Sequence, residues 1–427
     1  MTRARLPVDV SAFKAEADEP MTHLLRSACA LAMIVACGGA AFAQTAPVQT
    51  APCGGEFPAW LDGVRAEARA QGVSERAIAD GLAGVVIDPK VLALDRGQAV
   101  FQQTFLQFAS RMVAGQRLTK GPQVIRQNAA LFDRVKADYG VPASVITAFW
   151  GLETDYGANL GKFDTRNALA TLSHDCRRPD FFRPQLIAAL KIVDRGDLAP
   201  SEMRGAWAGE LGHTQMMPVD YLRDAVDGDG DGKRDLMRSV PDAIMSAGKY
   251  LSDMGWKRDE PWLQEVVVPA EMPWVEADID VKHPVGQWAD WGVKPRNGAL
   301  PPDEAKAALL LPMGRNGPAF LAYDNFDVYR KWNQSFIYAT TAAYLATRFD
   351  GAPEVSIGAA PVRPLTTDEL HELQRLLAKD GFLAGAPDGK LGGDTRKATR
   401  KAQAKLGLAA DGYPTLEVLQ ALAAQGG

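Results

Sequence analysis

The sequence predicts a mainly α-helical protein with minor β-structure and two domains. Apolar residues recur at three- and four-residue spacing from residue 57 to about 249, a pattern typical of amphipathic helices. The pattern returns at 333–348 and, after a Gly-, Ala- and Pro-rich stretch, in three short segments near the C-terminus. At 427 residues the chain is long enough for more than one domain.

The N-terminus has the pattern of a secretory signal. After Met21 come basic residues, an apolar stretch and the small residues AFA, so we expect residues 1–43 to be a signal peptide and Gln44 to begin the mature protein. The residues ahead of Met21 fit no targeting signal, which favours Met21 as the true start. The segment predicts a periplasmic protein. An alternative is the lipoprotein-like sequence IVACG, in which a lipid on Cys37 would anchor the protein to the outer membrane.

The rest of the chain predicts no membrane span and no nucleic-acid partner. No other segment has the ~18 apolar residues that a transmembrane helix needs. The net charge of -5 gives no electrostatic case for nucleic acid. Signal cleavage would leave the cysteines Cys53 and Cys176, and in an exported protein such a pair favours a disulfide. The alternative is two buried free thiols.

The main domain is expected to span residues 44–350. Gly72 should end its first helix and Ser74 should cap the next. Pro142 can occupy the first turn of a later helix, where its missing N–H costs nothing. Residues 261–318 are rich in Pro and Trp and are expected to be irregular, with a short strand near 265–268.

The second domain is expected at residues 365–427, after a linker at 351–364 that has no hydrophobic period. It is about the smallest size that folds unaided. Asp394 is the expected N-cap of its second helix. Its three expected helices span residues 367–380, 394–406 and 414–424.

The stretch FWGLETDYG is the first candidate for chemistry. Glu153 follows an apolar run, and burial against Phe149, Trp150 and Leu152 should keep its carboxyl protonated, because burial penalises the charged form. Such an acid can protonate a leaving oxygen, as general acids of glycoside cleavage do. The alternative is a glutamate at a helix end that makes an ion pair or a cap.

The loop GELGHTQMMPVDY is the second candidate. His213, Thr214 and Gln215 offer hydrogen-bonding groups, while Met216 and Met217 offer adaptable apolar surface. This composition suits a cleft that holds amides and hydroxyls. The alternative is a structural turn.

Taken together, several motifs resemble one family. ETDYG, ALATLSHDCRRPDFF, GHTQMMPVDY, DGDGDGKRDL, VPDAI and KYLSDMGW are similar, in order and spacing, to the membrane-bound lytic murein transglycosylase B family, glycoside hydrolase family 103. The resemblance covers residues 57–349. It implies a lysozyme-like catalytic domain that cleaves the MurNAc–GlcNAc β-1,4 bond of peptidoglycan glycan strands without water or cofactor, forming 1,6-anhydromuramoyl ends. Alternatives are a hydrolytic muramidase of the same fold and a non-catalytic peptidoglycan-binding scaffold.

The resemblance also implies roles for individual residues. Glu153 would be the single acid/base, protonating the leaving oxygen and then deprotonating the sugar's 6-hydroxyl. Asp155 and Glu210, the nearest other carboxylates in these motifs, are expected to be solvated. In three places the chain departs from the family: Ala206 replaces a serine, Met216 a phenylalanine and Trp332 a tyrosine. The residues that match substrate-contacting positions of the family are Arg177, Arg178, Gln215, Tyr250 and Tyr338.

The run DGDGDGKRD resembles the start of an EF-hand loop. Alternate carboxylates on a tight loop can surround Ca²⁺, although the twelfth position is Arg238 instead of Glu. The family pattern supplies the closing ligand further along the chain. A structural Ca²⁺ is therefore expected, and a metal-free acidic turn is the alternative. The expected ligands are Asp227, Asp229, Asp231, the backbone carbonyl of Lys233, and Asp242.

The C-terminal segment resembles the peptidoglycan-binding domain type 1 family. The resemblance rests on LQRLLAKDGFLAGAPDGKLGGDTRKATRKAQ and GLAADGYPT, and it implies a small three-helix domain. Ala402 stands where the family has a large aromatic residue. Such a domain would hold the enzyme on its polymer and raise its effective concentration there. Other wall-remodelling proteins are candidate partners.

Overall fold

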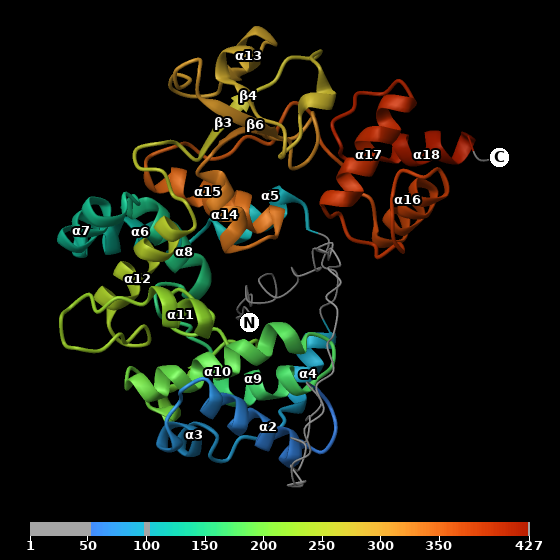
Figure 1. The fold of residues 1–427 in the computed structure, drawn as a ribbon. Coiled ribbons are helices and arrows are strands. Elements are labelled where there is room, and N and C mark those ends of the chain that lie inside the picture. Colours follow the sequence, from blue (N-terminus) through green and yellow to red (C-terminus); the bar gives the residue numbers. More distant parts are fainter. Residues whose placement is uncertain (1–52, 98–102, 426–427) are drawn as a thin grey trace, which may run out of the picture.

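The computed structural model describes residues 53–97 and 103–425 and confirms a mainly helical fold with minor β-structure (Figure 1). The predicted signal peptide at 1–43, with Met21 and Cys37, lies outside the described residues. Among the described helices, none combines the length and the apolar composition that crossing a bilayer requires. Four hydrophobic cores organise the chain, one for each of the regions that follow.

The N-terminal lobe packs helices around Val64, Leu186 and Trp207. As predicted, Gly72 follows the first helix in a left-handed conformation (φ 84°), and Ser74 Oγ accepts the Ala77 N–H at 3.2 Å to cap the next. The elements of this lobe are α2 (Phe57–Ala70), α3 (Glu75–Gly81), α4 (Pro89–Arg96), β1 (Phe163–Asp164), α9 (Thr165–His174), α10 (Pro179–Arg195), the 3-10 turn η1 (Pro200–Glu202), β2 (Arg204–Gly205) and α11 (Pro218–Asp224). Strands β1 and β2 form a small antiparallel ribbon.

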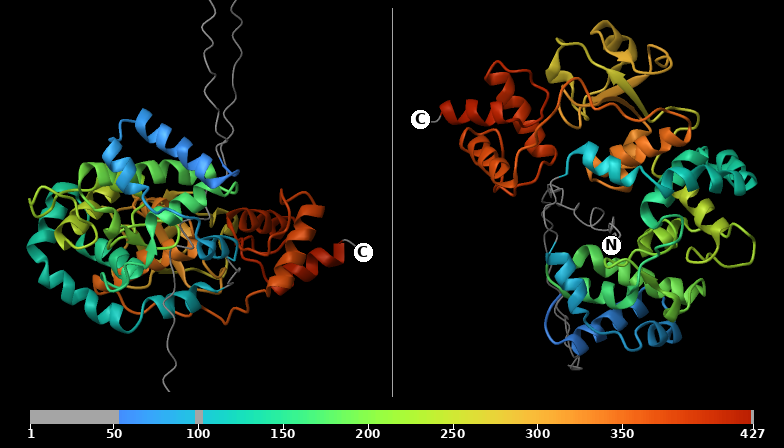
Figure 2. Two further views of the ribbon diagram at one scale, coloured as in Figure 1. Left: turned by 90° about the horizontal axis from the view of Figure 1, so that it is seen from below. Right: turned by 180° about the vertical axis from the view of Figure 1, so that it is seen from behind.

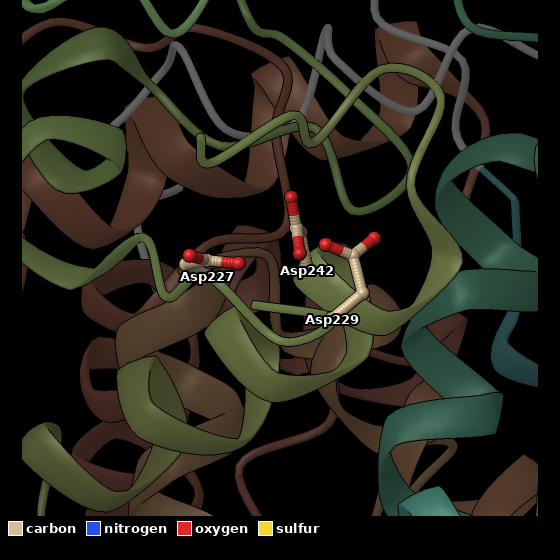
Figure 3. A group of neighbouring side chains, drawn as sticks. All are labelled: Asp227, Asp229 and Asp242. Carbon is tan, nitrogen blue, oxygen red and sulfur yellow. The ribbon is translucent and has the colours of Figure 1, made fainter. Parts of the chain in front are cut away.

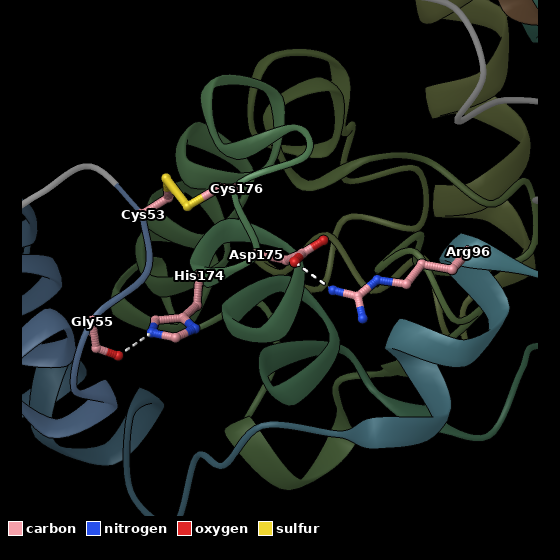
Figure 4. Close-up of a disulfide and its surroundings, with 6 residues drawn as sticks. All are labelled: Cys53, Gly55, Arg96, His174, Asp175 and Cys176. Atoms are coloured by element: carbon pink, nitrogen blue, oxygen red, sulfur yellow. Dashed lines mark hydrogen bonds and ion pairs between the residues drawn. A yellow bond between two sulfur atoms is a disulfide. The ribbon is translucent and has the colours of Figure 1, made fainter.

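A disulfide fastens the start of the described chain to this lobe (Figure 4). It joins Cys53 to Cys176, 123 residues later, as the sequence predicts. Beside it a ring nitrogen of His174 donates to the Gly55 carbonyl at 3.0 Å. The bond closes a long loop, so it restricts the unfolded chain and stabilises the folded lobe.

The central lobe is built around α8, a helix that is buried on nearly all sides. A helix that is apolar all round belongs inside a protein. Pro142 is the N-cap of α8, one position before the predicted first turn, and Asp155 ends the helix with φ 50°. The helices of this lobe are α5 (Phe105–Met112), α6 (Gln116–Gln127), α7 (Ala129–Tyr139), α8 (Ala143–Thr154), α12 (Val240–Asp253), α14 (Phe326–Trp332) and α15 (Phe336–Phe349).

The region predicted to be irregular, residues 261–318, supplies four strands of a five-stranded antiparallel sheet in the order β4-β6-β7-β3-β5, and the remaining strand, β7, follows directly after it. Leu309 lies opposite Leu321, and both pack into the sheet's own core, whereas Phe320 faces the central lobe. Because β7 is buried on both faces, it lacks the apolar–polar alternation that marks a half-buried strand. The elements are β3 (Leu263–Val267), the 3-10 turn η2 (Trp274–Glu276), β4 (His283–Pro284), α13 (Val285–Asp290), β5 (Lys294–Pro295), β6 (Lys306–Leu310) and β7 (Ala319–Tyr323).

The C-terminal domain is the predicted three-helix unit, formed by α16 (Thr367–Lys379), α17 (Gly393–Lys405) and α18 (Leu416–Gln425). The prediction that Asp394 caps α17 is wrong: the N-cap is Gly392, and Asp394 lies in the first turn, where a negative charge favours the helix dipole. Figures 1 and 2 show this domain beside the five-stranded sheet. Ala402 is fully buried in its core.

Candidate active site

Glu153 lies in the last turn of α8 with only 7% of its surface exposed. Its Oε1 accepts two hydrogen bonds, one from Trp332 Nε1 and one from the Tyr338 hydroxyl, both at 2.7 Å. Trp332 ends α14, and Tyr338 lies in the first turn of α15, where its N–H donates to Ser335 Oγ at 3.3 Å. A single short segment, residues 332–338, therefore supplies both donors; we call it the donor segment.

The nature of the donors fixes the role of each carboxyl oxygen. An indole N–H can only donate, so Oε1 must be an acceptor, and a proton on the neutral acid belongs on Oε2. Burial, with the adjacent Glu153 carboxyl adding to it, raises the pKa of Tyr338 well above its ordinary value. Tyr338 therefore keeps its hydroxyl proton and remains a donor at any physiological pH.

Aromatic packing holds the donor segment in place. The Trp332 ring stacks on Phe149 of α8, with centroids 4.2 Å apart and planes 23° from parallel. Tyr250 of α12 contacts the same indole, with ring centroids 5.3 Å apart, and its hydroxyl donates to Asp220 at 3.1 Å. The structure thus brings Tyr250 and Tyr338, both predicted from the sequence, around Trp332 and Glu153. Their contact with substrate stays a prediction.

The predicted loop at residues 209–217 folds inward and is buried. Gln215 is 4% exposed and has φ 50°, a conformation that is rare for a residue with a side chain and that recurs at functional sites. Its side-chain amide donates to the carbonyls of Gly212 at 2.8 Å and Leu160 at 3.3 Å. Glu210, expected to be solvated, is only 1% exposed, because the inward fold of the loop removes it from water.

His213 connects this loop to α8. Its Nδ1 accepts the Trp150 indole N–H at 2.9 Å, and its carbonyl accepts the Thr154 hydroxyl at 2.6 Å. The pKa of His213 is lowered, mainly by burial, so the ring is neutral with Nδ1 unprotonated. A side chain at Gly157 would strike this ring, since a Cβ there would lie 2.3 Å from His213 Cε1. The sequence placed His213 in a cleft; in the structure its ring bonds Trp150 of α8, its carbonyl accepts from Thr154, and its N–H donates to the Leu236 carbonyl.

The paired arginines lie at the junction of α9 and α10. Arg177 Nε and Arg178 Nη2 both bond the Asp95 carboxylate, at 2.6 and 2.5 Å, and Asp95 is 2% exposed. Asp155, the residue after α8, forms an ion pair with Arg117 at 2.7 Å. These pairs give both arginines and Asp155 a structural role. Substrate contact by Arg177 and Arg178 stays a prediction.

The acidic loop, residues 227–242, gathers carboxylates as predicted (Figure 3). Oxygens of Asp227, Asp229 and Asp242 lie within 4.8 Å of one another. Asp231 lies outside this group, and its Oδ1 accepts the Lys233 N–H at 2.8 Å. Three carboxylates at this spacing are hard oxygen donors of the kind that Ca²⁺ takes.

Two of these carboxylates differ in their surroundings. Asp227 accepts the backbone N–H groups of Gly232, Gly230 and Asp231, and these bonds, the Gly232 bond foremost, lower its pKa. Asp242 is fully buried, which raises its pKa although the N–H groups of Gly228 and Asp235 donate to it. A bound cation would offset this burial cost and the mutual repulsion of the carboxylates.

The fold and the buried glutamate place the chain in the class of helical, lysozyme-like proteins. The chain belongs to the transglycosylase family whose domain is described as the transglycosylase SLT domain, and the family model matches residues 56–347. The model of the putative peptidoglycan binding domain matches residues 366–422. Both resemblances seen in the sequence are thereby confirmed.

Several known proteins are similar over most of the chain. SltB3 from Pseudomonas aeruginosa, solved in complex with NAG-anhNAM-pentapeptide, is 39% identical with a TM-score of 0.81 over 87% of this chain and all of that one. Slt35 from Escherichia coli, solved in complex with calcium, is 25% identical with a TM-score of 0.60, over 71% of this chain and 97% of that one. Membrane-bound lytic murein transglycosylase B of Escherichia coli (strain K12) is 28% identical over 236 residues, which make up 55% of this chain and 64% of that protein.

Proposed function

We propose that the protein is a lytic transglycosylase that cleaves the MurNAc–GlcNAc β-1,4 bond of peptidoglycan and forms 1,6-anhydromuramoyl ends, with Glu153 as its single acid/base. The observation that carries the proposal is the buried Glu153 carboxyl, whose Oε1 is held by Trp332 and Tyr338 in a chain of the transglycosylase family. The SltB3 complexes with NAG-anhNAM-pentapeptide and NAG-NAM-pentapeptide support the substrate class.

The geometry suits one carboxyl that acts twice. With Oε1 engaged by two donors, the proton on Oε2 is the one that passes to the glycosidic oxygen as the bond to the leaving sugar breaks. The resulting carboxylate is stabilised by the same two donors, because hydrogen bonds to the charged form favour it. Oε2 then takes the proton of the sugar's own 6-hydroxyl as that oxygen bonds to C1. The acid is restored, and no water enters the products.

The C-terminal domain is proposed to bind peptidoglycan and to keep the enzyme on its polymer. We propose a periplasmic location, reached through the N-terminal signal, with a lipid on Cys37 as the alternative. The Cys53–Cys176 disulfide supports an oxidising compartment. Arg177, Arg178, Gln215, Tyr250 and Tyr338 are the proposed substrate-binding residues.

Ca²⁺ is the proposed structural ion of the acidic loop, with no part in the proton transfers. Asp227, Asp229 and Asp242 would hold it through carboxylate oxygens, and Asp231 and the Lys233 carbonyl would complete the set. The calcium complex of Slt35 supports this choice of ion. When bound, the ion would neutralise charge on the loop whose Leu236 carbonyl accepts the His213 N–H.

Digestion of purified sacculi, with mass spectrometry of the products, tests the proposal. Wild-type protein should release muropeptides with anhydro ends, and Glu153→Gln should slow release by roughly 10³-fold, the scale of general acid–base catalysis. Asp155→Asn, which alters the neighbouring ion pair, is the matched control and should keep most of the activity. Reducing ends would indicate a hydrolytic muramidase. A wild type that sediments with sacculi but releases nothing would indicate a binding scaffold.

A further inference from the structure

The C-terminal domain is joined to the main domain by more than its connecting segment. The Tyr413 side chain is 3% exposed and is part of the central lobe's hydrophobic core, together with Trp332 and Tyr338. The Asp411 carboxylate accepts the backbone N–H of Arg315 in the main domain at 2.9 Å. Gly314 approaches so closely that a Cβ there would lie 2.8 Å from Tyr413 Cβ.

The predicted linker, residues 351–364, also lies against the main domain. The Ser356 N–H donates to Glu265 Oε1 at 2.8 Å, and the Ala360 N–H donates to the Asn316 carbonyl at 3.2 Å. A flexible tether would leave its backbone groups to water. The contacts instead fix the C-terminal domain at one place on the main domain.

Arg396 of α17 lies at the centre of this contact. Its guanidinium donates to the carbonyls of Pro312 at 2.8 Å and Leu311 at 3.3 Å. These two residues directly follow strand β6. The guanidinium also lies between two rings, 4.9 Å from the centroid of Phe336 and 5.5 Å from that of Tyr413. Burial lowers the pKa of Arg396 to about 10, so the side chain remains charged at neutral pH and its contacts with the rings are desolvated.

Phe336 connects this contact to the acid. It is the first residue of α15 and lies within the donor segment, between Trp332 and Tyr338. We propose that Arg396 is a positioning residue of the enzyme: by clamping Phe336 against the sheet, the C-terminal domain holds the donor segment in register with Glu153. This inference rests on the proposed function, and it gives the domain a second role beside polymer binding.

A second arginine of α17 also bonds to the main domain and supports the position of Arg396. Arg400, one turn after Arg396 on α17, forms an ion pair with Asp278 and donates to the Ala277 carbonyl. Its side chain is 12% exposed and that of Asp278 is 14% exposed, so the pair is largely shielded from solvent. Lys397 pairs with Asp280 at 2.7 Å but is half exposed, and exposed pairs of this kind contribute little. Arg396 and Arg400, which are more shielded from solvent than Lys397, therefore make the main contribution to the docking.

A soluble glycan fragment separates the two roles of the domain, because an anchor gives no advantage when the substrate is free in solution. In the full-length protein, Arg396→Ala should lower kcat on GlcNAc–MurNAc oligomers by about 10-fold, since misplacement of less than 1 Å near a catalytic group has effects of this order. The KM should change much less, and the pH profile of kcat should change, because the two side chains that hydrogen-bond the Glu153 carboxyl are displaced. Sedimentation with sacculi should match wild type.

Arg396→Lys keeps a cation over Phe336 and should recover part of the rate. The matched control is Arg375→Ala, which removes an exposed arginine of α16 that pairs only with Glu372 among the described residues. It should leave kcat unchanged. If Arg396→Ala does not fold, as judged by circular dichroism, Phe336→Leu carries the test: it removes the ring that Arg396 covers and should lower kcat in the same direction.

Two results would overturn the inference. One is wild-type kcat for Arg396→Ala, or for Phe336→Leu, on the soluble oligomers. The other is a variant whose activity is reduced only on sacculi, in step with reduced sedimentation. That result would mean that the C-terminal domain acts as an anchor alone. Both presuppose a wild type that forms anhydro ends on the oligomers. If the wild type forms none, the proposed function itself is wrong.

Discussion

The carboxyl of Glu153 and the carboxylates of the acidic loop have different neighbours. Glu153 is a single acid at the end of a buried helix, and its Oε1 accepts from two neutral side chains that come from a distant part of the chain. Asp227, Asp229 and Asp242 lie within 4.8 Å of one another on one short stretch, and backbone N–H groups donate to Asp227 and Asp242.

The difference shows how environment assigns a role to one chemical group. A single carboxyl whose Oε1 is saturated by donors can gain and lose a proton at Oε2 without rearrangement, which is what a general acid and base requires. Clustered carboxylates that are held by backbone groups are instead arranged for a cation. Substitutions that act on one group and spare the other test this distinction.

Among the substitutions that test this comparison and leave Glu153 in place, the largest effect is expected from removing a donor to its carboxyl. Tyr338→Phe deletes one of the two hydrogen bonds to Oε1 and should lower kcat by about 10- to 100-fold, since a hydrogen bond to a charged group contributes ~1.5–3 kcal/mol. Steady-state kinetics on soluble oligomers measures it. Tyr329→Phe is the matched control: its hydroxyl is buried but bonds to no group that the structure describes, so its removal should leave kcat unchanged. Equal losses in both variants would mean that packing alone governs the rate.

A smaller effect, on stability, is expected at the acidic loop. Calcium should raise the Tm of the wild type, by the equivalent of about 2.7 kcal/mol at 100 times the Kd. Asp242→Asn should abolish this rise, and without calcium it should be less stable than the wild type, because its amide nitrogen cannot accept one of the two backbone N–H groups that donate to the Asp242 oxygens. Calorimetry with EDTA and with calcium measures both, and Asp62→Asn on α2 is the exposed control. If calcium leaves the Tm of the wild type unchanged, the proposal of a structural Ca²⁺ is contradicted.

Some of the features compared here can be predicted from the sequence, and others cannot. The acidic loop is predictable because its carboxylates alternate with glycines over a few residues, and Glu153 is predictable because a charge ends an apolar run. The donors of Glu153 are not, since Trp332 and Tyr338 lie 179 and 185 residues further along the chain. Family resemblance marked Tyr338, but it marked Trp332 only as a departure.

Two further features could not be predicted from the sequence, and the reasons are physical. The five-stranded sheet is hidden because strands buried on both faces, such as β7, have no alternating pattern. The segment 351–364 has the composition of a linker, but composition does not reveal that Ser356 and Ala360 bond to the main domain. The site as a whole depends on such long-range contacts, whereas the helices depend on local pattern.

The smallest expected effect concerns His213, which links the two regions because it bonds Trp150 of α8 and the Leu236 carbonyl of the acidic loop. Burial lowers its pKa in the folded protein. Between that value and the unfolded pKa of about 6.5, the unfolded chain binds a proton that the folded chain does not, so stability falls as pH drops below about 6.5. Protonation at Nδ1 would also break the bond from the Trp150 indole.

His213→Asn retains an acceptor near the position of Nδ1 but cannot titrate, so its Tm should fall less than that of the wild type between pH 7 and pH 5. Thermal unfolding over this range measures the difference, and His371→Asn, an exposed histidine of α16, is the control. A parallel decline in wild type and His213→Asn would assign the acid sensitivity to other groups. A flatter profile for His213→Asn would show that protonation of the buried His213 ring destabilises the folded protein at acidic pH.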